Sequence, residues 1–400
     1  MGFVGDYADF QNGFAFKSKD FSAEGDYKVI KIKEIKDGKV KFTDDTAYVN
    51  HGEGIEKYVV ENGDVLFALT GDPISKPNPL SWVGRVSLYI SDDKAVLNQR
   101  VCKLIPKEGV NSLYLYYFFR NTSEFHLLAG KATGSASQAN ISTKTIADTV
   151  IDLPDLAYQN KVVGVLQALD KKIELNNSIN DNLLQQAQAI YMHIFGDNSS
   201  VTAATIADIA LNVTDGVHNT VKDDPEGQYL LLSCKNIKGG LLSIGSSERK
   251  INSETFEKLR RRTKLAKGDI LISSVGTVGE LLLLNTDPSN YEFQRSVAIV
   301  KPNPELVSSA YVYEALVAKK AELINAAHGA VQQCLFISDI AGFPIGIPNP
   351  AELRSFDEVV KPMFDTITAN EAENLRLEVL RDTLLPKLMS GELEVSELDL

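Results

Sequence analysis

The sequence predicts an α+β fold in which two similar β-rich domains are separated by two long helices packed as an antiparallel coiled coil. Three observations carry this prediction. One sequence pattern occurs twice in the chain, each copy contains short β-branched runs, and each copy closes with a heptad pattern typical of a long helix.

The internal repeat rests on matches that follow one another in the same order in both halves. The segment YKVIKIKEIKDGKV from Tyr27 matches YLLLSCKNIKGGLL from Tyr229. The further matches are Gly63 with Gly268, Gln99-Arg100 with Gln294-Arg295, Tyr114 with Tyr311, and Ile151 and Pro154 with Ile345 and Pro348. The offset drifts only from 205 to 194, so the chain reads as two copies of one unit of about 200 residues.

Each copy has the same internal order of expected elements. Short β-branched runs broken by Gly, Asp and Asn predict strands at 29–35, 64–69, 101–105, 269–273 and 297–300. A helical stretch follows at 112–128 in the first copy and at 309–327 in the second. A Gly/Ser/Gln-rich loop comes next, at 133–138 and 328–333, before the closing helix.

The closing helices carry the clearest periodicity, with seam positions that step by three and four from Leu166 to Ile194 and from Val360 to Leu388. The two helices could pack parallel or antiparallel. Buried asparagines need polar partners and therefore set the register. An antiparallel pairing places Asn176 opposite Asn374 and Asn180 opposite Asn370, and Leu169 is then the one apolar seam position that meets a charged residue, Arg381.

These patterns divide the chain into four parts. We expect a first β-rich domain at 1–153, a central long helix at 154–197, a second β-rich domain at 198–347, and a distal long helix with the C-terminal tail at 348–400. Net charge is uneven among the segments. Residues 1–150 and 198–346 each carry −1, whereas 151–197 carry −3 and 347–400 carry −7. The acidic helices are either solvated faces or surfaces for a basic protein partner.

Composition excludes several classes of protein. No run of about 18 apolar residues is present, so the sequence predicts no membrane span. The three cysteines stand singly, which argues against a disulfide scaffold and fits a cytoplasmic location. The five histidines are also scattered, so we expect no bound metal.

A search for catalytic motifs finds little. There is no Walker lysine motif, no GxSxG elbow and no Asn/Asp-Pro-Pro-Tyr/Phe methyltransferase tetrapeptide. Paired aspartates such as Asp44-Asp45 lie in polar, turn-like contexts and are more often solvated turns than nuclease acids. The segment Gly276-Thr277-Val278-Gly279 reads as a tight turn after a strand.

Side chains suited to nucleic acid are more frequent. Lysine mostly neutralises phosphates, while arginine and glutamine suit bidentate contacts to base edges. The DNA-binding candidates are Lys17, Lys19, Lys76, Trp82, Arg85, Arg100, Gln138, Lys222, Arg260, Arg261, Arg262, Arg295, Gln332 and Gln333. Each also has a structural interpretation: the triple arginine could be an exposed linker, Trp82 a core residue, and the repeated Gln-Arg pairs buried structural elements.

Two motifs are specific enough to indicate a family. The second closing helix ends in LLPKLMSGEL from Leu384, and the first copy opens with GFAFKS from Gly13. Asn140-Ile141-Ser142 fits as well, whereas the second copy has Phe336-Ile337-Ser338 there and lacks the GFAF opening. With the alternation of β-rich units and long helices, the whole chain resembles the DNA specificity (S) subunit of type I restriction-modification systems.

The resemblance implies a function that the residues alone do not supply. Each β-rich unit would be a target-recognition domain for one half of a split, asymmetric site in double-stranded DNA. The helices would dock methyltransferase (modification) subunits, and restriction subunits would join the complex. The chain itself would be non-catalytic and hold no cofactor, because S-adenosylmethionine, ATP and Mg²⁺ would bind to the partner subunits.

Two other classes of function remain open on the sequence alone. The near-neutral β-rich units are compatible with a two-domain protein-interaction scaffold that does not bind DNA. A stand-alone DNA methyltransferase or nuclease is a catalytic alternative. A salt-dependent interaction with duplex DNA would separate the first from a specificity subunit, and cofactor binding by the pure chain would reveal the second.

Overall fold

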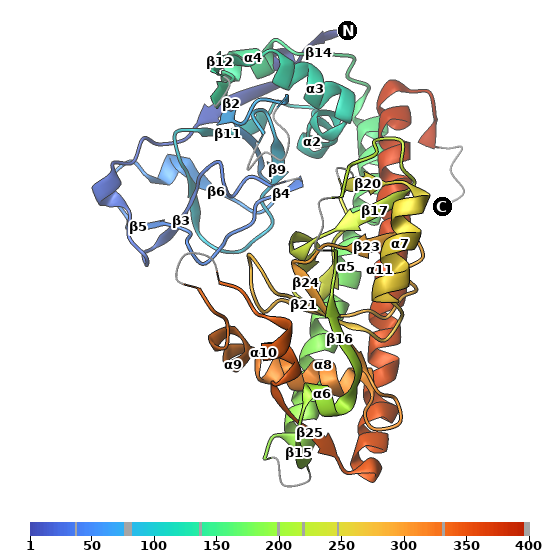
Figure 1. The fold of residues 1–400 in the computed structure, drawn as a ribbon. Coiled ribbons are helices and arrows are strands. Elements are labelled where there is room, and N and C mark those ends of the chain that lie inside the picture. The colour runs from blue at the N-terminus through green and yellow to red at the C-terminus, as the bar shows by residue number, and fades with distance from the viewer. Residues whose placement is uncertain are drawn as a thin grey trace. The chain divides into compact units, whose positions relative to one another are not determined.

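The computed structural model describes residues 1–36, 38–75, 82–135, 138–197, 201–217, 221–245, 248–329 and 333–395, with the Ser135 side chain left aside. The chain forms two compact units, shown as a ribbon in Figure 1. Unit 1 comprises Met1–Ile173 and Arg376–Leu400, and unit 2 comprises Glu174–Leu375. Both unit boundaries fall inside the long helices, so the domain boundaries expected at 153, 197 and 347 stay a prediction.

Unit 1 is built on a five-stranded sheet with the order β2-β11-β7-β9-β4. The strands are β2 (Ala8–Asn12), β11 (Val101–Pro106), β7 (Val65–Ala68), β9 (Val86–Leu88) and β4 (Gly38–Lys39). The neighbours are antiparallel except β4 and β9, which are parallel. Because β7 is buried along its whole length, all four of its residues are small or apolar, as its Val-Leu-Phe-Ala sequence predicts.

Smaller sheets and helices complete unit 1. A four-stranded sheet has the order β5 (Tyr48–Val49), β3 (Tyr27–Ile30), β10 (Ala95–Leu97) and β6 (Val59–Val60), a three-stranded sheet has β12 (Thr133–Ser135), β13 (Gln138–Asn140) and β8 (Thr70–Gly71), and β1 (Gly2–Phe3) pairs with β14 (Val150–Ile151). The α-helices are α1 (Val4–Tyr7), α2 (Ser112–Arg120), α3 (Thr122–Gly130) and α4 (Thr143–Ala147), and the 3₁₀ turns are η1 (Ser18–Asp20) and η2 (Glu56–Tyr58).

Unit 2 repeats this plan. Its main sheet has the order β16 (Ala210–Asp215), β24 (Val297–Pro302), β21 (Ile270–Ser273) and β22 (Leu281–Leu283). A three-stranded sheet has the order β20 (Arg249–Ile251), β17 (Tyr229–Leu232) and β23 (Tyr291–Phe293). Two further pairs are β15 (Val201–Thr205) with β25 (Pro344–Pro348), and β18 (Ile237–Lys238) with β19 (Leu241–Leu242). Its helices are α6 (Ile206–Ile209), α7 (Ser253–Thr263), η3 (Cys234–Asn236), α8 (Ser309–Ala318), α9 (Lys320–Asn325) and α10 (Ile337–Ala341).

The repeat predicted from the sequence is confirmed by strand order. The series β2-β11-β7-β9 in unit 1 matches β16-β24-β21-β22 in unit 2. Tyr27 and Tyr229 each begin a strand that runs parallel to a partner, β10 in unit 1 and β23 in unit 2. Gly63 and Gly268 precede the central strands with φ of 97° and 93°, a left-handed conformation that glycine adopts without strain.

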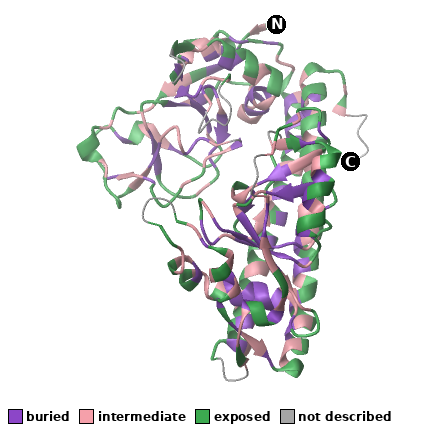
Figure 2. Ribbon diagram, in the orientation of Figure 1, coloured by how far each residue is buried: buried purple, intermediate pink, exposed green. Residues whose placement is uncertain are grey.

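Each unit has its own core. Burial is densest on the central strands and on the helix faces that cover them, coloured purple in Figure 2. In unit 1 the core includes Phe67 of β7 and Phe119 of α2, whose rings meet edge to face at 5.0 Å. In unit 2 it includes Tyr311 of α8 and Phe356 of the distal helix. Burial of this kind stabilises each unit separately from the other.

Two expected helices differ from the structure. The helices expected at 112–128 and 309–327 are each two helices. In the first case the break falls at Asn121, whose φ of −57° and ψ of 125° are not helical, and whose side chain accepts from the Ser123 N–H as the cap of α3. An asparagine inside an apolar run competes with the helix backbone in this way.

The strand expected at 29–35 is also shorter, because β3 ends at Ile30. The next residues form a turn in which the buried Glu34 carboxylate accepts from the Lys31 N–H at 3.0 Å. Unit 2 contains the same device after β17, where the Asn236 side chain accepts from the Ser233 N–H at 2.9 Å. The β-branched sequence pattern therefore extends beyond Ile30, although the strand ends there because the Glu34 side chain stabilises a turn.

The long helices are α5 (Leu156–Phe195) and α11 (Pro350–Ser390), which lie side by side in Figure 1. In unit 2, Asn176 Nδ2 donates to Asn374 Oδ1 at 2.9 Å, and Asn370 Nδ2 donates to Asn180 Oδ1 at 2.8 Å. The helices therefore run antiparallel, and the predicted asparagine register is confirmed.

The helix segments of unit 1 pair in the same direction. Tyr158 near the start of α5 donates to the Leu388 carbonyl near the end of α11 at 3.3 Å. Arg381, predicted to face Leu169, instead donates to the next residue, Asp170, at 2.8 Å. Asp170 also accepts from Arg120 and Tyr117 of α2, so this charged layer is satisfied on both sides.

Candidate nucleic-acid interface

Antiparallel pairing brings several loops to one end of the main sheet in unit 1. The last residue of β7, Ala68, faces the first residue of β11, Val101, and Phe67 faces the first residue of β9, Val86. Asn12, which ends β2, faces Cys102. The residues that follow β2 and β7 and precede β9 and β11 therefore meet at one end, which we call the loop edge: residues 12–14, 69–72, 82–85, 98–100 and 138–142.

Unit 2 has an equivalent loop edge. Ser273, which ends β21, faces Val297 at the start of β24, and Asp215 at the end of β16 faces Ala298. A backbone hydrogen bond from Leu335 to the Ser274 carbonyl adds the segment that follows the Gly/Gln loop. The loop edge of unit 2 comprises residues 215–217, 274–279, 294–296 and 333–337. The tight turn predicted at Gly276–Gly279 lies on it.

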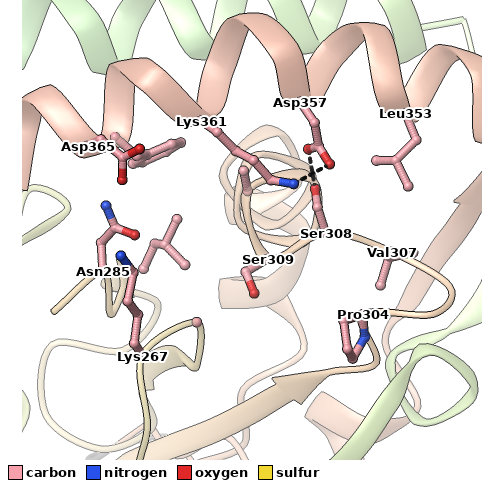
Figure 3. A pocket seen from close by; sticks show the side chains of 14 residues that line it. Lys267, Asn285, Pro304, Val307, Ser308, Ser309, Leu353, Asp357, Lys361 and Asp365 are labelled. Atoms are coloured by element: carbon pink, nitrogen blue, oxygen red, sulfur yellow. Dashed lines mark hydrogen bonds and ion pairs between the residues drawn. The ribbon is translucent and has the colours of Figure 1, made fainter. Parts of the chain in front are cut away.

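The opposite end of the sheet in unit 2 faces helix α11 across a cavity of about 440 Å³. Figure 3 shows that cavity, with Asp357 and Lys361 projecting from the helix toward Ser308. Ser308 donates to Asp357 at 2.6 Å, and Lys361 pairs with the same carboxylate at 2.8 Å. In unit 1 the corresponding end is tied to α5, where Gln159 accepts from the Asn111 N–H at 2.8 Å. In both units, therefore, it is the end opposite the loop edge that packs on a long helix.

Equivalent backbone hydrogen bonds build the central turn of each loop edge. In unit 1, Val101 donates to the Asn98 carbonyl and Leu69 donates to the Arg100 carbonyl, both at 2.9 Å. In unit 2, Val297 donates to the Gln294 carbonyl at 3.0 Å and Ser274 donates to the Ser296 carbonyl at 2.9 Å. In each unit, the bond donated by the valine closes the turn, and the bond donated by Leu69 or Ser274 attaches the turn to the end of the central strand.

These bonds correct the sequence alignment of the Gln-Arg pairs. Val101 is equivalent to Val297, so Gln99 is equivalent to Arg295, and Arg100 is equivalent to Ser296. The prediction that the two Gln-Arg pairs share positions is therefore wrong by one residue. Gln99, Arg100 and Arg295 are all exposed, which also removes the buried structural interpretation for them.

A glycine holds each turn against the neighbouring strand. Gly13 donates to the Val101 carbonyl at 3.0 Å, and Gly216 donates to the Val297 carbonyl at 3.1 Å. A Cβ on Gly13 would overlap the Asn98 carbonyl, and one on Gly216 would overlap the carbonyls of Phe293 and Gln294. Sequence reasoning missed that Gly216 matches the Gly13 of the GFAF opening, although both follow Asn or Asp at similar distances from the repeat start.

Two of the three clustered arginines in unit 2 are structural. Arg260 pairs with the fully buried Glu292 and donates to the Tyr291 carbonyl at 2.9 Å. Burial raises the pKa of Glu292, and the Arg260 guanidinium opposes that rise. Arg262 donates to Asp215 at 2.8 Å and to the Gly216 carbonyl at 2.9 Å. The triple arginine is thus the last turn of helix α7, and the linker interpretation is wrong.

The remaining candidates of unit 2 lie on its surface. Arg261, Lys222 and Gln333 are exposed, and Gln333 belongs to the loop edge. Gln332 falls outside the described residues. Arg295 lines a cavity of about 490 Å³ on the loop edge, together with Ser274, Gln294 and the exposed ring of Phe336.

In unit 1, Trp82 and Arg85 lie together at the loop edge. The Trp82 ring contacts Phe125 of α3 with centroids at 5.8 Å, and the Arg85 guanidinium lies 4.8 Å from the Trp82 ring. Trp82 is only half-buried, so it is at once a packing residue and part of the surface. Gln138 is exposed in β13, whereas Lys76 falls outside the described residues.

The GFAF segment forms an aromatic surface beside the loop edge of unit 1. The exposed Phe14 ring meets Phe16 at 4.8 Å and Tyr58 at 5.2 Å. Lys19 lines a cavity of about 380 Å³ next to these rings, and Lys17 is exposed two residues before it. Aromatic rings with lysines nearby suit contacts to bases and phosphates.

Other chemistry is sparse in the described part of the chain. The three cysteines are unpaired, and burial raises the pKa of the Cys102 thiol far above its ordinary value. Among the described residues, no group of three or more His, Cys, Asp or Glu side chains could hold a metal ion. No helix in the described ranges is long and apolar enough to cross a membrane.

Comparisons with known proteins agree on one family. Residues 1–185 match the family model described as "Type I restriction modification DNA specificity domain". The chain is 25% identical to the type I restriction enzyme MjaIX specificity subunit of Methanocaldococcus jannaschii, over 88% of this chain and 84% of the relative. It is 24% identical to the EcoBI specificity subunit of Escherichia coli, over 96% of this chain and 84% of the relative.

The fold is also found among solved structures. The type I restriction-modification S subunit from M. genitalium superposes with a TM-score of 0.57 at 16% identity, covering 97% of this chain and 95% of that one. At this identity the likeness concerns the fold alone.

Proposed function

We infer the function of this chain from the family to which it belongs, the DNA specificity subunits of type I restriction-modification systems. A specificity subunit recognises a DNA sequence. We propose that this chain reads a split, asymmetric site in double-stranded DNA, with unit 1 reading one half and unit 2 the other. It would do so inside a complex with methyltransferase and restriction subunits.

The observation that carries the proposal is the pair of equivalent loop edges. Each unit contributes one main sheet with the same strand order and one cluster of loops at the end away from its long helix. The loops differ in sequence although the strands that hold them are equivalent. One scaffold with two different sets of exposed side chains is what reading two different half-sites requires.

The long helices support two further parts of the proposal, the spacing between the half-sites and the contacts with partner subunits. Helices α5 and α11 contain 40 and 41 residues, and a helix of that length extends about 60 Å. Two half-sites one turn of DNA apart need a spacing of about 34–36 Å. The segments 151–197 and 347–400 also carry most of the net negative charge of the chain, so they suit contacts with protein rather than with DNA.

The chain would act as a non-catalytic subunit. Adenine methylation with S-adenosylmethionine, and DNA cleavage with ATP and Mg²⁺, would belong to the partner subunits. A cytoplasmic location is part of the same proposal, and the three unpaired cysteines support it.

Two measurements test the proposal. Sequencing of methylated adenines in DNA from cells that carry the chain with its partner subunits should reveal one two-part sequence, which disappears when the chain is deleted. Duplex DNA binding by the same complex should weaken steeply as salt rises, because lysine and arginine contacts release counterions. A protein-interaction scaffold would show neither the two-part sequence nor the salt dependence.

A further inference from the structure

We propose that Gln99 in unit 1 and Arg295 in unit 2 are equivalent base-reading residues, each of which determines one base pair in its own half-site. This inference rests on the proposed function and assigns it to two side chains. Arg295 would recognise a guanine and Gln99 an adenine.

The equivalence comes from the backbone of the loop edges. Both residues are the second residue of a turn that begins at Asn98 or Gln294 and closes on the amide of Val101 or Val297. The residue that opens each turn also donates to the strand of the parallel pair, at 3.0 Å from Asn98 to Ile30 and at 2.8 Å from Gln294 to Leu232.

The turns are held rigidly, whereas the two side chains are free to bind a ligand. Gly13 and Gly216 press against the turns so closely that neither position has room for a Cβ. In unit 2, Arg295 also donates its backbone N–H to the Val217 carbonyl at 3.1 Å. Within the described ranges, neither the Gln99 nor the Arg295 side chain has a hydrogen-bond or ion-pair partner, and both are exposed.

The other arginines near the loop edge of unit 2 are not available in this way. Arg260 is committed to the buried Glu292, and Arg262 is committed to Asp215 and Gly216. Both arginines stabilise the residues that support the loop edge. Arg261 lies on helix α7, where it donates to the Glu257 carbonyl one turn earlier. Arg295 is therefore the arginine of the loop edge that can reach a base.

The two side chains differ in what they can read. An arginine donates two hydrogen bonds to O6 and N7 of guanine, while a glutamine pairs with N6 and N7 of adenine in the major groove. The cavity beside Arg295 offers the exposed Phe336 ring for an additional contact to the same base pair, and the buried Ser274 hydroxyl donates to the Arg295 carbonyl at 3.3 Å. One equivalent position with two different side chains gives each half-site its own base.

The decisive experiment exchanges the two side chains in the intact complex of the chain with its partner subunits. R295Q should change one base pair of the second half-site and leave the first half unchanged. Q99R should change one base pair of the first half only. The expected preference for the original base falls by roughly 10- to 100-fold, the range for one bidentate pair. Methylated sequences in cells carrying each variant give the readout.

Three further variants and one selection sharpen the result. R295K keeps the charge without the planar pair of donors, so it should also lose the base preference. R261Q removes one exposed positive charge of unit 2 outside the turn and should leave the recognised bases as in the wild type. N98A alters the first residue of the turn but keeps the Gln99 side chain, so the base pair that unit 1 prefers should stay the same. If a variant methylates too weakly, selection of bound duplexes from a random library gives its preference directly.

The outcomes separate this inference from the proposed function. If the wild-type complex has a two-part site and R295Q keeps every base of it, Gln99 and Arg295 do not read bases and only this inference is overturned. A change in both halves from one substitution would overturn it too. If the wild-type complex recognises no sequence at all, the proposed function itself fails.

Discussion

At the scale of single residues, buried polar groups determine how this chain pairs with itself. Asn176 and Asn180 of α5 are 1% and 0% exposed, and each meets an asparagine of α11. Asn374 also donates to Asn177 at 2.8 Å, and Glu373 accepts from Asn176 at 2.8 Å. A shift of one heptad would place these amides against leucine or isoleucine, at a cost that aliphatic pairs do not impose.

We therefore predict that one asparagine cannot be replaced alone. N176L should lower the free energy of unfolding by about 1–3 kcal/mol, because it leaves the Asn374 oxygen buried without a donor. The double variant N176L/N374L should lose less than the sum of the two single variants, since two leucines can pack together. Urea denaturation followed by helical circular dichroism measures all four proteins. Additive losses would contradict the pairing.

Glu314 of α8 gives a second prediction. It is 1% exposed, and burial raises its pKa to about 8 from an ordinary value of 4.5. Gln188 of α5, with its amide nitrogen turned toward α8, donates to the carboxylate, but the other oxygen has no partner in the described part of the chain. A neutral carboxylic acid is thus the form that suits this position.

The sign of the pH dependence follows from this shift. Between about pH 4.5 and 8 the folded state holds a proton that the unfolded state has released, so the contribution of Glu314 to stability is present at low pH and is lost as pH rises through about 8. The midpoint of thermal unfolding should fall over this range, and E314Q should make the fall shallower. E371Q should make the fall shallower in the same way, because burial also raises the pKa of Glu371, to about 7. A pH profile of E314Q that coincides with wild type would contradict the assignment.

At the scale of elements, periodic sequence patterns predicted the long helices correctly, whereas the places where shorter helices and strands end were not predicted. The heptads of α5 and α11 and their register follow from the sequence, because seam residues and asparagines repeat over many turns. The break at Asn121 and the early end of β3 depend on single side chains that cap or close a turn. Hydrophobic periodicity in a short segment does not show where a helix or strand ends. The Asn-Thr-Ser sequence after Arg120 is nevertheless a capping signal that could have indicated the break.

The loop edges could be predicted only in part. The repeat drew attention to the Gln-Arg pair of each copy, but it matched Gln99 with Gln294, whereas the structure makes Gln99 equivalent to Arg295. Backbone hydrogen bonds identify the true equivalents, and these bonds join residues far apart in the sequence. The roles of Arg260 and Arg262 were also hidden, because their partners Glu292 and Asp215 lie 32 and 47 residues away.

The glycines of the loop edges yield a prediction at this scale. G13A in unit 1 should lower stability by about 2 kcal/mol or more, because its Cβ would overlap the backbone oxygen of Asn98, which cannot move without opening the turn. G164A is the control: Gly164 lies inside α5 with nothing near its Cβ position, so alanine there should stabilise by about 0.5–1 kcal/mol. Thermal unfolding of both variants tests this. A G13A protein as stable as G164A would show that the turn is not locked.

At the scale of the whole molecule, duplication explains both the fold and the function that we propose. Two units with one strand order would let a single chain carry the two recognition surfaces that we propose, and helices α5 and α11 each run from one unit into the other. The target bases do not follow from the sequence, because the loop edges are the parts in which the two copies differ. If the chain binds DNA as we propose, the geometry of the loop edges favours Gln99 and Arg295 as the side chains that read bases.

The most direct test of the central claim is to exchange residues 198–346 for the equivalent segment of a relative and to sequence methylated adenines in cells that carry the hybrid with its partner subunits. If each unit reads its own half-site, the half read by unit 1 will be unchanged, the other half will become that of the relative, and the spacing will stay the same. A hybrid that alters both halves, or that keeps the original site, would contradict the account.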